Sequence, residues 1–238
     1  MRQGRLEAFL SYASKDRALA KRLKKQLEHL SGIGVFVAPE DIRPSRIEWR
    51  KRIVKRVKEC DIFLALLTRY YRRSEWTDQE TGMAIAQSKL IIPLKVGKSK
   101  PHGFLESYQW LTLSPRFLGK GCSDILTIIK DDSRLKDRIK WSFITCFRES
   151  RNFDEANDRS ELLETLGPYD GKQVNYLFSA YLERIDIHHG YTASRILVDL
   201  LIRNRKLVKS AMIRKARQVS KSPSRSEFLH LDRLLAAF

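Results

Sequence analysis

The apolar run Ile62–Leu67 constrains the fold of this chain more than any other stretch. It is six residues long, it follows Asp61, and polar residues begin again at Thr68. A strand buried on both faces of a parallel sheet has this continuous pattern, because neither face alternates with water. We therefore expect a central parallel strand here, with a helix that begins near Ser74 at the strand's carboxyl end.

Further strand-like runs alternate with helical patterns along the first half of the chain. Leucines at helical spacing separate the first two runs, a basic amphipathic stretch precedes Ile62, and a closing helix is expected at 123–130. The other expected strands are Glu7–Ser11, Gly34–Val37, Leu90–Lys95 and a short edge strand within 110–113. This alternation predicts an α/β fold, a flavodoxin-like doubly wound parallel sheet that ends near Lys130.

From Asp131 onward the strand signals vanish and amphipathic helices take over. We expect two domains, an α/β domain at residues 1–130 and an all-α module at residues 131–238. A serine-rich segment at 220–226 is expected to be a mobile hinge. The helices are expected at 135–147, from 160 to Gly167-Pro168, at 174–182, as one long helix at 193–219, and at 227–237.

The net charge of +18 gives the chain a strong attraction for anions. Phosphate-bearing ligands, nucleic acid and acidic lipid all fit such a charge, which chooses none of them. The basic stretch 207–219, which includes Arg214, Lys215 and Arg217, is a candidate for binding nucleic acid or a membrane surface, although a basic helix more commonly packs one face and exposes the other to water. No apolar run approaches the roughly 20 residues of a membrane helix. We expect a soluble cytoplasmic protein with no membrane partner.

Cysteine and histidine usage favours no metal or disulfide. Cys60, Cys122 and Cys146 are far apart and lie among apolar neighbours, as core residues of a reducing compartment do. His188 and His189 are adjacent, whereas metal ligands are normally spaced. We therefore expect no metal site.

The polar connections that follow the first three strands are the candidate site. In doubly wound sheets, ligands bind outside the carboxyl ends of the strands, so the segments 11–16, 38–45 and 68–76 should converge on one cleft. Trp76 and Glu80 lie four apart and share a helix face. An indole beside a carboxylate suits a flat, cationic, electron-poor substrate.

A purely structural alternative exists for the same residues. Thr77 followed by Glu80 is a capping-box pattern, and Trp76 is also a plausible core anchor. On spacing alone, this structural interpretation is the commoner one.

Two other ligand-binding folds with a similar topology lack their signatures here. A dinucleotide-binding half needs glycines after the first strand, and the segment 11–16 has none. A phosphoacceptor receiver needs acidic residues at the ends of the first and third strands, where Ser11, Tyr12 and Thr68 stand instead.

The order of these motifs resembles the Toll/interleukin-1 receptor (TIR) domain family over residues 6 to about 130. Glu7–Tyr12 is similar to the family's first box, Pro39–Ser45 to its BB loop, and Ser74-x-Trp76-x-x-x-Glu80 to the helix motif of its enzymatic members. The variants most similar to it are bacterial and archaeal TIR proteins, which often serve in anti-phage defence. One departure is Pro44-Ser45, where family BB loops usually hold a glycine.

The resemblance implies an enzyme that cleaves NAD+, with Glu80 as the catalytic residue and NAD+ as a substrate, so no cofactor is expected. Trp76 is implied to line or stack in the site, and the first box and the BB loop to contact substrate. The candidate substrate-binding residues are Phe9, Ser11, Tyr12, Asp41, Arg43, Ser45, Ser74 and Trp76.

The chemistry suits a single carboxylate. Nicotinamide leaves as a neutral heterocycle and needs no general acid, unlike the leaving groups of ordinary glycosidases. A carboxylate can stabilise the charge of the oxocarbenium-like transition state. Capture by water gives ADP-ribose and capture by adenine gives a cyclic product.

The resemblance also implies activation by self-association of the TIR domain, with a second protein or a nucleotide as trigger. The alternative is a non-enzymatic scaffold that acts through TIR–TIR contacts.

Overall fold

The computed structural model of this chain describes residues 5–37 and 46–238; the side chains of 46–49 and of Ser224 are not part of that description. The chain divides into two compact units, one ending at Ile139 and the other covering Lys140–Phe238. Each unit is described by itself below.

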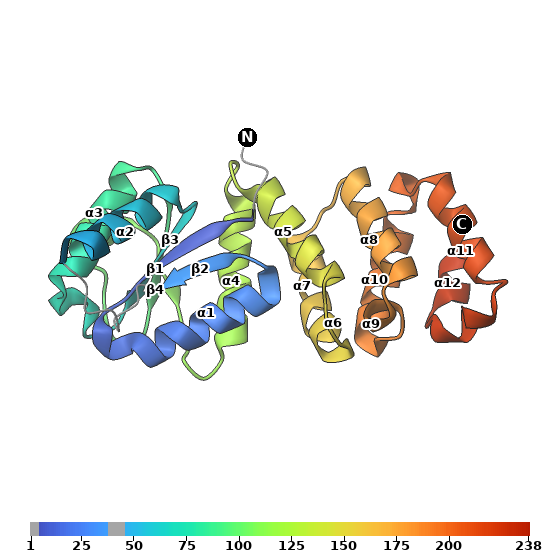
Figure 1. Cartoon of the computed structure of the whole chain (residues 1–238), viewed down its shortest axis with the longest axis horizontal. Coiled ribbons are helices and arrows are strands. Elements are labelled where there is room, and N and C mark those ends of the chain that lie inside the picture. The colour runs from blue at the N-terminus through green and yellow to red at the C-terminus, as the bar shows by residue number, and fades with distance from the viewer. Residues whose placement is uncertain (1–4, 38–45) are drawn as a thin grey trace. The chain divides into compact units, whose positions relative to one another are not determined.

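The first unit is built on a five-stranded parallel sheet in the order β2-β1-β3-β4-β5 (Figure 1). The central strand β3 is buried along its whole length, as its continuous apolar run predicts. The strands are β1 (Glu7–Ser11), β2 (Gly34–Val37), β3 (Ile62–Leu67), β4 (Leu90–Lys95) and β5 (Leu111–Thr112). The flavodoxin-like α/β prediction is confirmed.

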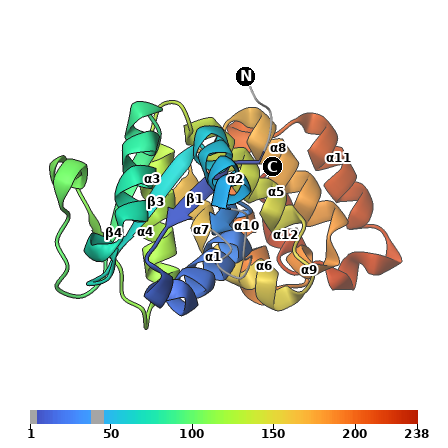
Figure 2. The same cartoon turned by 60° about the vertical axis from the view of Figure 1, so that its left-hand side comes forward.

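Helices cover both faces of this sheet, which makes it doubly wound (Figures 1 and 2). One face carries α1 (Arg17–Ser31) and α4 (Leu118–Asp131), which begins earlier than the predicted closing helix. The other face carries α2 (Arg46–Glu59) and α3 (Glu75–Ala86). The candidate motif helix is therefore α3, directly after the carboxyl end of β3.

Phe9 on β1 anchors the core between the sheet and the α2/α3 layer. Its ring centroid lies 5.5 Å from that of Phe36 and 5.7 Å from that of Phe63, and it packs in one cluster with Ile53 and Val57 of α2. Alternate residues of a strand share a face, so Ser11, two residues further along β1, also faces this layer. The packing of Phe9 thus fixes the direction in which Ser11 points.

The division between the units lies inside α5 (Lys136–Arg148), later than the boundary predicted at residue 130. Arg138 in the first turn of α5 donates two hydrogen bonds to the carboxylate of Asp61, at 2.6 and 2.9 Å. This ion pair attaches the start of α5 to the residue before β3. That residues 1–130 and 131–238 are separate domains stays a prediction.

The second unit is helical, in agreement with the predicted all-α module. Its elements after α5 are α6 (Phe153–Ser160), α7 (Leu162–Leu166), α8 (Gly171–Glu183), α9 (Ile185–His188), α10 (Tyr191–Arg203), α11 (Ser210–Val219) and α12 (Leu231–Leu235). Helix α10 packs against α6, α8, α9 and α12 and is the centre of this unit (Figure 1).

The single long helix predicted at 193–219 is wrong, because α10 and α11 are separate helices. The side-chain amide of Asn175 on α8 replaces helical hydrogen bonds at the break: its nitrogen donates to the carbonyl of Leu207 at 2.8 Å, and its oxygen accepts from the backbone of Lys209 at 2.9 Å. The predicted hinge contains a short 3-10 helix at Pro223–Glu227. After it, the ring of Phe228 stacks on His188 with centroids 3.8 Å apart.

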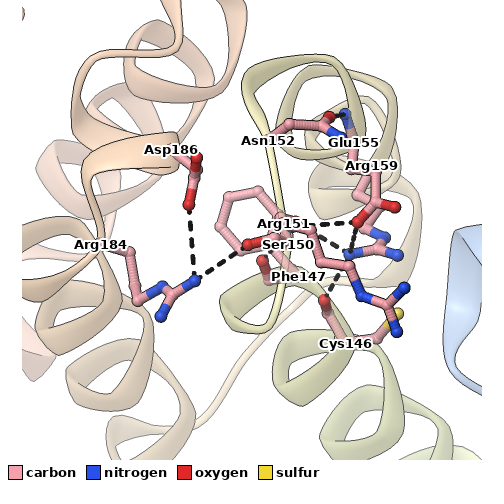
Figure 3. A network of polar contacts seen from close by, with 9 residues as sticks. All are labelled: Cys146, Phe147, Ser150, Arg151, Asn152, Glu155, Arg159, Arg184 and Asp186. Carbon is pink, nitrogen blue, oxygen red and sulfur yellow. Dashed lines mark hydrogen bonds and ion pairs between the residues drawn. The ribbon is translucent and has the colours of Figure 1, made fainter.

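A buried arginine organises the polar contacts between α5 and α6 (Figure 3). The Arg159 guanidinium donates to the carbonyl of Cys146 at 2.9 Å and to Ser150 Oγ at 3.0 Å, and it lies 3.3 Å from the carboxylate of Glu155. Orphan carbonyls at a helix end need such donors. A second arginine, Arg184 at the end of α8, donates to the carbonyl of Ser150 at 3.0 Å.

The surface of α11 is strongly basic. Arg214, Lys215 and Arg217 are exposed, while Ala216 between them is buried. This is the arrangement of a helix that packs one face, and nucleic-acid binding by these residues stays a prediction. Across the described ranges, no helix has the length and apolar character that crossing a membrane requires.

Replacing Arg159 with methionine should lower the free energy of unfolding by about 2–3 kcal/mol, because buried acceptors at the end of α5 lose their donor. Chemical denaturation followed by circular dichroism measures the loss. Arg151→Met is the control, because Arg151 contacts the network only through its backbone N–H and its side chain is exposed; it should change stability by less than about 0.5 kcal/mol. Equal effects of the two substitutions would contradict this role for Arg159.

Candidate active site

The first turn of α3 is fixed by its own backbone and by one threonine. Ser74 is the N-cap residue, without a side-chain capping bond, and Glu75 is the first helical residue. The Thr77 hydroxyl lies 2.7 Å from the carbonyl of Ser74 and 2.9 Å from that of Tyr71, and its one proton is shared between these two acceptors. This joins α3 to the preceding 3-10 turn Tyr71–Arg73 and sets the direction of the helix.

Glu80 faces β1 from the second turn of α3. Its Oε2 lies 2.6 Å from the Oγ of Ser11, the last residue of β1. Both side chains are buried, with Glu80 5% exposed. The capping-box interpretation is therefore wrong: Thr77 lies inside the helix, and the carboxyl group of Glu80 bonds across to the sheet.

Burial raises the pKa of Glu80 from its ordinary 4.5 to about 7, against the lowering effect of the hydrogen bond from Ser11. In the part of the chain that the structure describes, Glu80 forms no ion pair with lysine, arginine or histidine. A carboxyl group that is desolvated without a cation favours its neutral form. A carboxyl group tuned to titrate near neutrality at the end of a parallel sheet is a strong candidate for function.

Trp76 lies one turn before Glu80 and is half-buried. The guanidinium carbon of Arg50, on α2, lies 5.3 Å from the centroid of the indole ring. A cation over an aromatic face at this distance is a favourable contact. Trp76 is thus neither a fully buried core anchor nor a fully exposed ring, and a flat cation already occupies one of its faces.

The other predicted site residues do not all lie at the carboxyl ends of the strands. Ser74 starts α3, and Tyr12, directly after β1, is half-buried. The side chain of Phe9 has no exposed surface, and it contacts Phe36 and Phe63 in the core. This packing does not support a direct contact of Phe9 with substrate, because the Phe9 ring is buried in the core, two residues before Ser11 on the same strand. Three predicted residues lie outside the described residues: Asp41, Arg43 and Ser45.

Two residues that the sequence interpretation missed extend the Glu80–Ser11 contact. The Tyr71 hydroxyl lies 3.1 Å from Ser11 Oγ and 3.1 Å from Thr81 Oγ1, and Thr81 Oγ1 donates to the carbonyl of Thr77 at 2.7 Å. Tyr71 is 1% exposed, and burial raises the pKa of its hydroxyl well above the ordinary value. The one signal in the sequence was the i, i+4 spacing of Thr77 and Thr81 beside Glu80.

A second polar contact ties the neighbouring strand ends together. Asp16 precedes α1 but makes no side-chain capping bond; the Thr68 hydroxyl, directly after β3, donates to its carboxylate. Burial raises the pKa of Asp16, and the bond from Thr68 opposes that effect. The connections after β1 and β3 converge here, as the fold predicts.

The adjacent histidines lie in the helical unit. His188 is buried, with Nδ1 2.9 Å from the carbonyl of Tyr181, and burial lowers its pKa. Within residues 5–37 and 46–238, no group of three or more histidine, cysteine, aspartate or glutamate side chains is placed to hold a metal ion.

The buried carboxyl group of Glu80 should make the free energy of unfolding depend on pH. Because folding raises the pKa of Glu80, its stabilising contribution is fully present below pH 4.5 and is lost as the pH rises to about 7. The lost free energy is about 3 kcal/mol at most. Glu80→Gln stays neutral, so its stability relative to the wild type should increase by up to this amount between pH 4 and pH 8. Urea denaturation of both proteins at each pH measures it, and a constant difference would contradict the raised pKa.

The comparisons with known proteins agree with this geometry. A family model described as TIR domain matches residues 8–125, which include all of β1 but its first residue, the other four strands, Glu80 and most of α4. A search of curated proteins gave no match. Residues 8–125 therefore belong to the TIR domain family, and the chain is a TIR domain protein.

Proposed function

We propose that this protein cleaves the nicotinamide–ribose bond of NAD+, with Glu80 as the catalytic carboxylate. The observation that carries the proposal is the position of Glu80. Among the described residues it is buried with no cationic partner, bonded to Ser11 at the carboxyl end of β1, and one turn from the half-buried indole of Trp76. A residue that only capped a helix would need none of these features.

One carboxylate is sufficient for this reaction. The bond between C1′ of the ribose and the nicotinamide nitrogen breaks with both electrons going to the nitrogen, which loses its positive charge. The ribose becomes oxocarbenium-like, and ionised Glu80 stabilises that charge through space and through the ribose hydroxyls. Burial strengthens this effect, because few water dipoles compete with the carboxylate. Ser11 holds the carboxylate in place by its hydrogen bond.

Trp76 supplies a flat apolar surface for the substrate. In the described state the Arg50 guanidinium lies over the indole ring, as a planar cation. The oxidised nicotinamide ring is also planar and cationic, so it can take the place of Arg50 on the ring. Arg50 is exposed and on α2, and once displaced it is available to a phosphate of the dinucleotide.

The proposed enzyme acts in an assembly, as the resemblance to enzymatic TIR domains implies. Self-association of the TIR domain completes the site, and a trigger sensed by the helical unit promotes it in anti-phage defence or signalling. Water as the acceptor at C1′ releases ADP-ribose, whereas an adenine nitrogen as the acceptor closes a cyclic product.

Nicotinamide release from NAD+ by the full chain, measured over a wide range of protein concentrations with a crowding agent, tests this function. We expect turnover per chain to rise with concentration because assembly completes the site. Glu80→Gln should lower it by at least about 100-fold, as loss of a transition-state electrostatic contact does. Glu75→Gln, an exposed glutamate on the same helix, is the matched control and should keep wild-type activity.

Full activity of Glu80→Gln in the assembled state would contradict the proposed catalytic role. Absence of release at every concentration, together with concentration-dependent self-association, would favour the scaffold alternative. Liquid chromatography of the same reactions separates ADP-ribose from cyclic products.

Substitutions of Trp76 test the stacking surface. Trp76→Ala should lower kcat/KM for nicotinamide release about tenfold or more, because stacking on an aromatic side chain contributes about 1–3 kcal/mol. Trp76→Phe keeps a ring and should lose less. Similar losses in both variants would show that stacking is not the role of this side chain.

A further inference from the structure

A continuous row of oxygen atoms runs from Glu80 into α3. The carboxyl Oε2 of Glu80 contacts Ser11 Oγ at 2.6 Å, and Ser11 Oγ contacts the Tyr71 hydroxyl at 3.1 Å. The Tyr71 hydroxyl then contacts Thr81 Oγ1 at 3.1 Å, which donates to the carbonyl of Thr77 at 2.7 Å. All of these groups are buried. The Glu80 carboxyl group can gain a proton, and each of the three hydroxyl groups can rotate to point its proton at either neighbour. The Thr77 carbonyl has no proton and can only accept. We call this row the hydroxyl chain.

With Glu80 ionised, the hydroxyl chain has too few protons. The carboxylate can only accept, so Ser11 donates to it, and the Thr77 carbonyl can only accept, so Thr81 donates to that. Tyr71 has a single proton, which it can give to Ser11 or to Thr81. The remaining contact then places two oxygen lone pairs against each other at 3.1 Å without a proton between them.

With Glu80 protonated, every contact holds one proton. Glu80 donates to Ser11, Ser11 to Tyr71, Tyr71 to Thr81, and Thr81 to the Thr77 carbonyl. All donors then point the same way, and hydrogen bonds in such a row strengthen one another. A buried polar group without its partner costs free energy, so the complete row favours the neutral carboxyl group.

We propose that Tyr71 and Thr81 are positioning residues that hold Glu80 in its neutral form through the hydroxyl of Ser11. When Glu80 loses its proton to solvent or to an incoming base, Ser11 turns its hydroxyl from Tyr71 to Glu80. The hydroxyl chain thereby sets how readily the carboxylate forms. Its effect on NAD+ cleavage rests on the proposed function, but the proton count itself does not.

Among residues 5–37 and 46–238, no neighbouring charge supplies the same effect. Burial dominates the raised pKa of Glu80, with the Ser11 bond as the opposing cause. The charged groups on the surrounding elements have partners of their own. After β1, Asp16 accepts from Thr68. On α3, Asp78 lies 3.0 Å from His102. On α2, Arg50 lies over Trp76. On the other side, Tyr71 stays neutral because burial raises its pKa.

Titration of Glu80 in variants of Thr81 tests the proposal without using enzymatic activity. The readout is the side-chain carboxyl carbon-13 resonance of Glu80 in the full chain, assigned by its absence in Glu80→Gln. Thr81→Val has nearly the same shape but no hydroxyl. In this variant the neutral state leaves the Tyr71 proton without an acceptor. The ionised state keeps a complete row, in which Tyr71 donates to Ser11 and Ser11 donates to Glu80.

We therefore expect Thr81→Val to lower the pKa of Glu80 by about one unit from the wild-type value, because the neutral state loses the free energy of about one hydrogen bond. Thr81→Ser keeps the hydroxyl and is the matched control, with the wild-type titration. Tyr71→Phe should also lower the pKa, because it too leaves the neutral state one acceptor short. Ser11→Ala should raise it, since the carboxylate loses its donor.

A pKa of Glu80 that is unchanged or raised in both Thr81→Val and Tyr71→Phe would overturn the proposal, whatever the NAD+ cleavage assay shows. A lowered pKa in both, in a protein that releases no nicotinamide, would support the hydroxyl chain and contradict the proposed function. The two ideas can therefore fail separately.

Discussion

The candidate site depends on one contact, the hydrogen bond between Glu80 on α3 and Ser11 at the end of β1. It holds a carboxyl group out of water with no compensating cation in the described part of the chain, which costs free energy that other contacts must offset. The sheet supplies the fixed point, since Phe9 locks β1 into the core and leaves Ser11 facing α3. The first turn of α3, fixed by Thr77, supplies the other side of the contact. A loop could not hold the two groups at this distance as rigidly.

The same arrangement explains why the candidate site can change state. A carboxyl group with a pKa raised to about 7 exists in both protonation states near neutral pH, and in our proposal the hydroxyl chain adds to the effect of burial in favouring the neutral one. Trp76 is likewise held in a resting contact, with Arg50 over its ring. In the proposed reaction, the substrate would replace the Arg50 guanidinium on the indole ring of Trp76. It would then lie near the carboxyl group of Glu80, which ionises easily at neutral pH. Both features fit the proposed NAD+-cleaving function, in which activity is kept low until assembly.

Much of the fold was predictable because it follows from short-range patterns. The continuous apolar run of β3 and the leucine spacing of α1 predicted the α/β sheet, and the position of Trp76 and Glu80 after β3 predicted the site. The errors come from partners that are distant in the sequence. Asn175 on α8 bonds to Leu207 and Lys209 at the break in the helix predicted at 193–219. Tyr71 and Thr81 were missed for the same reason, since only the folded chain brings their hydroxyls to Ser11. Asp41, Arg43 and Ser45 lie outside the described residues, and their roles stay predictions.

The pH dependence of kcat/KM for nicotinamide release tests the central claim most directly, because it joins the position of Glu80 to its chemistry. The ionised carboxylate is the active form, so kcat/KM should rise about tenfold per pH unit below pH 7 and level off above it. The assembled wild-type protein should be compared with Thr81→Val, whose rise should be displaced to lower pH. A rate that is constant from pH 5 to pH 9, or one that falls through this range, would contradict catalysis by a buried Glu80 carboxylate.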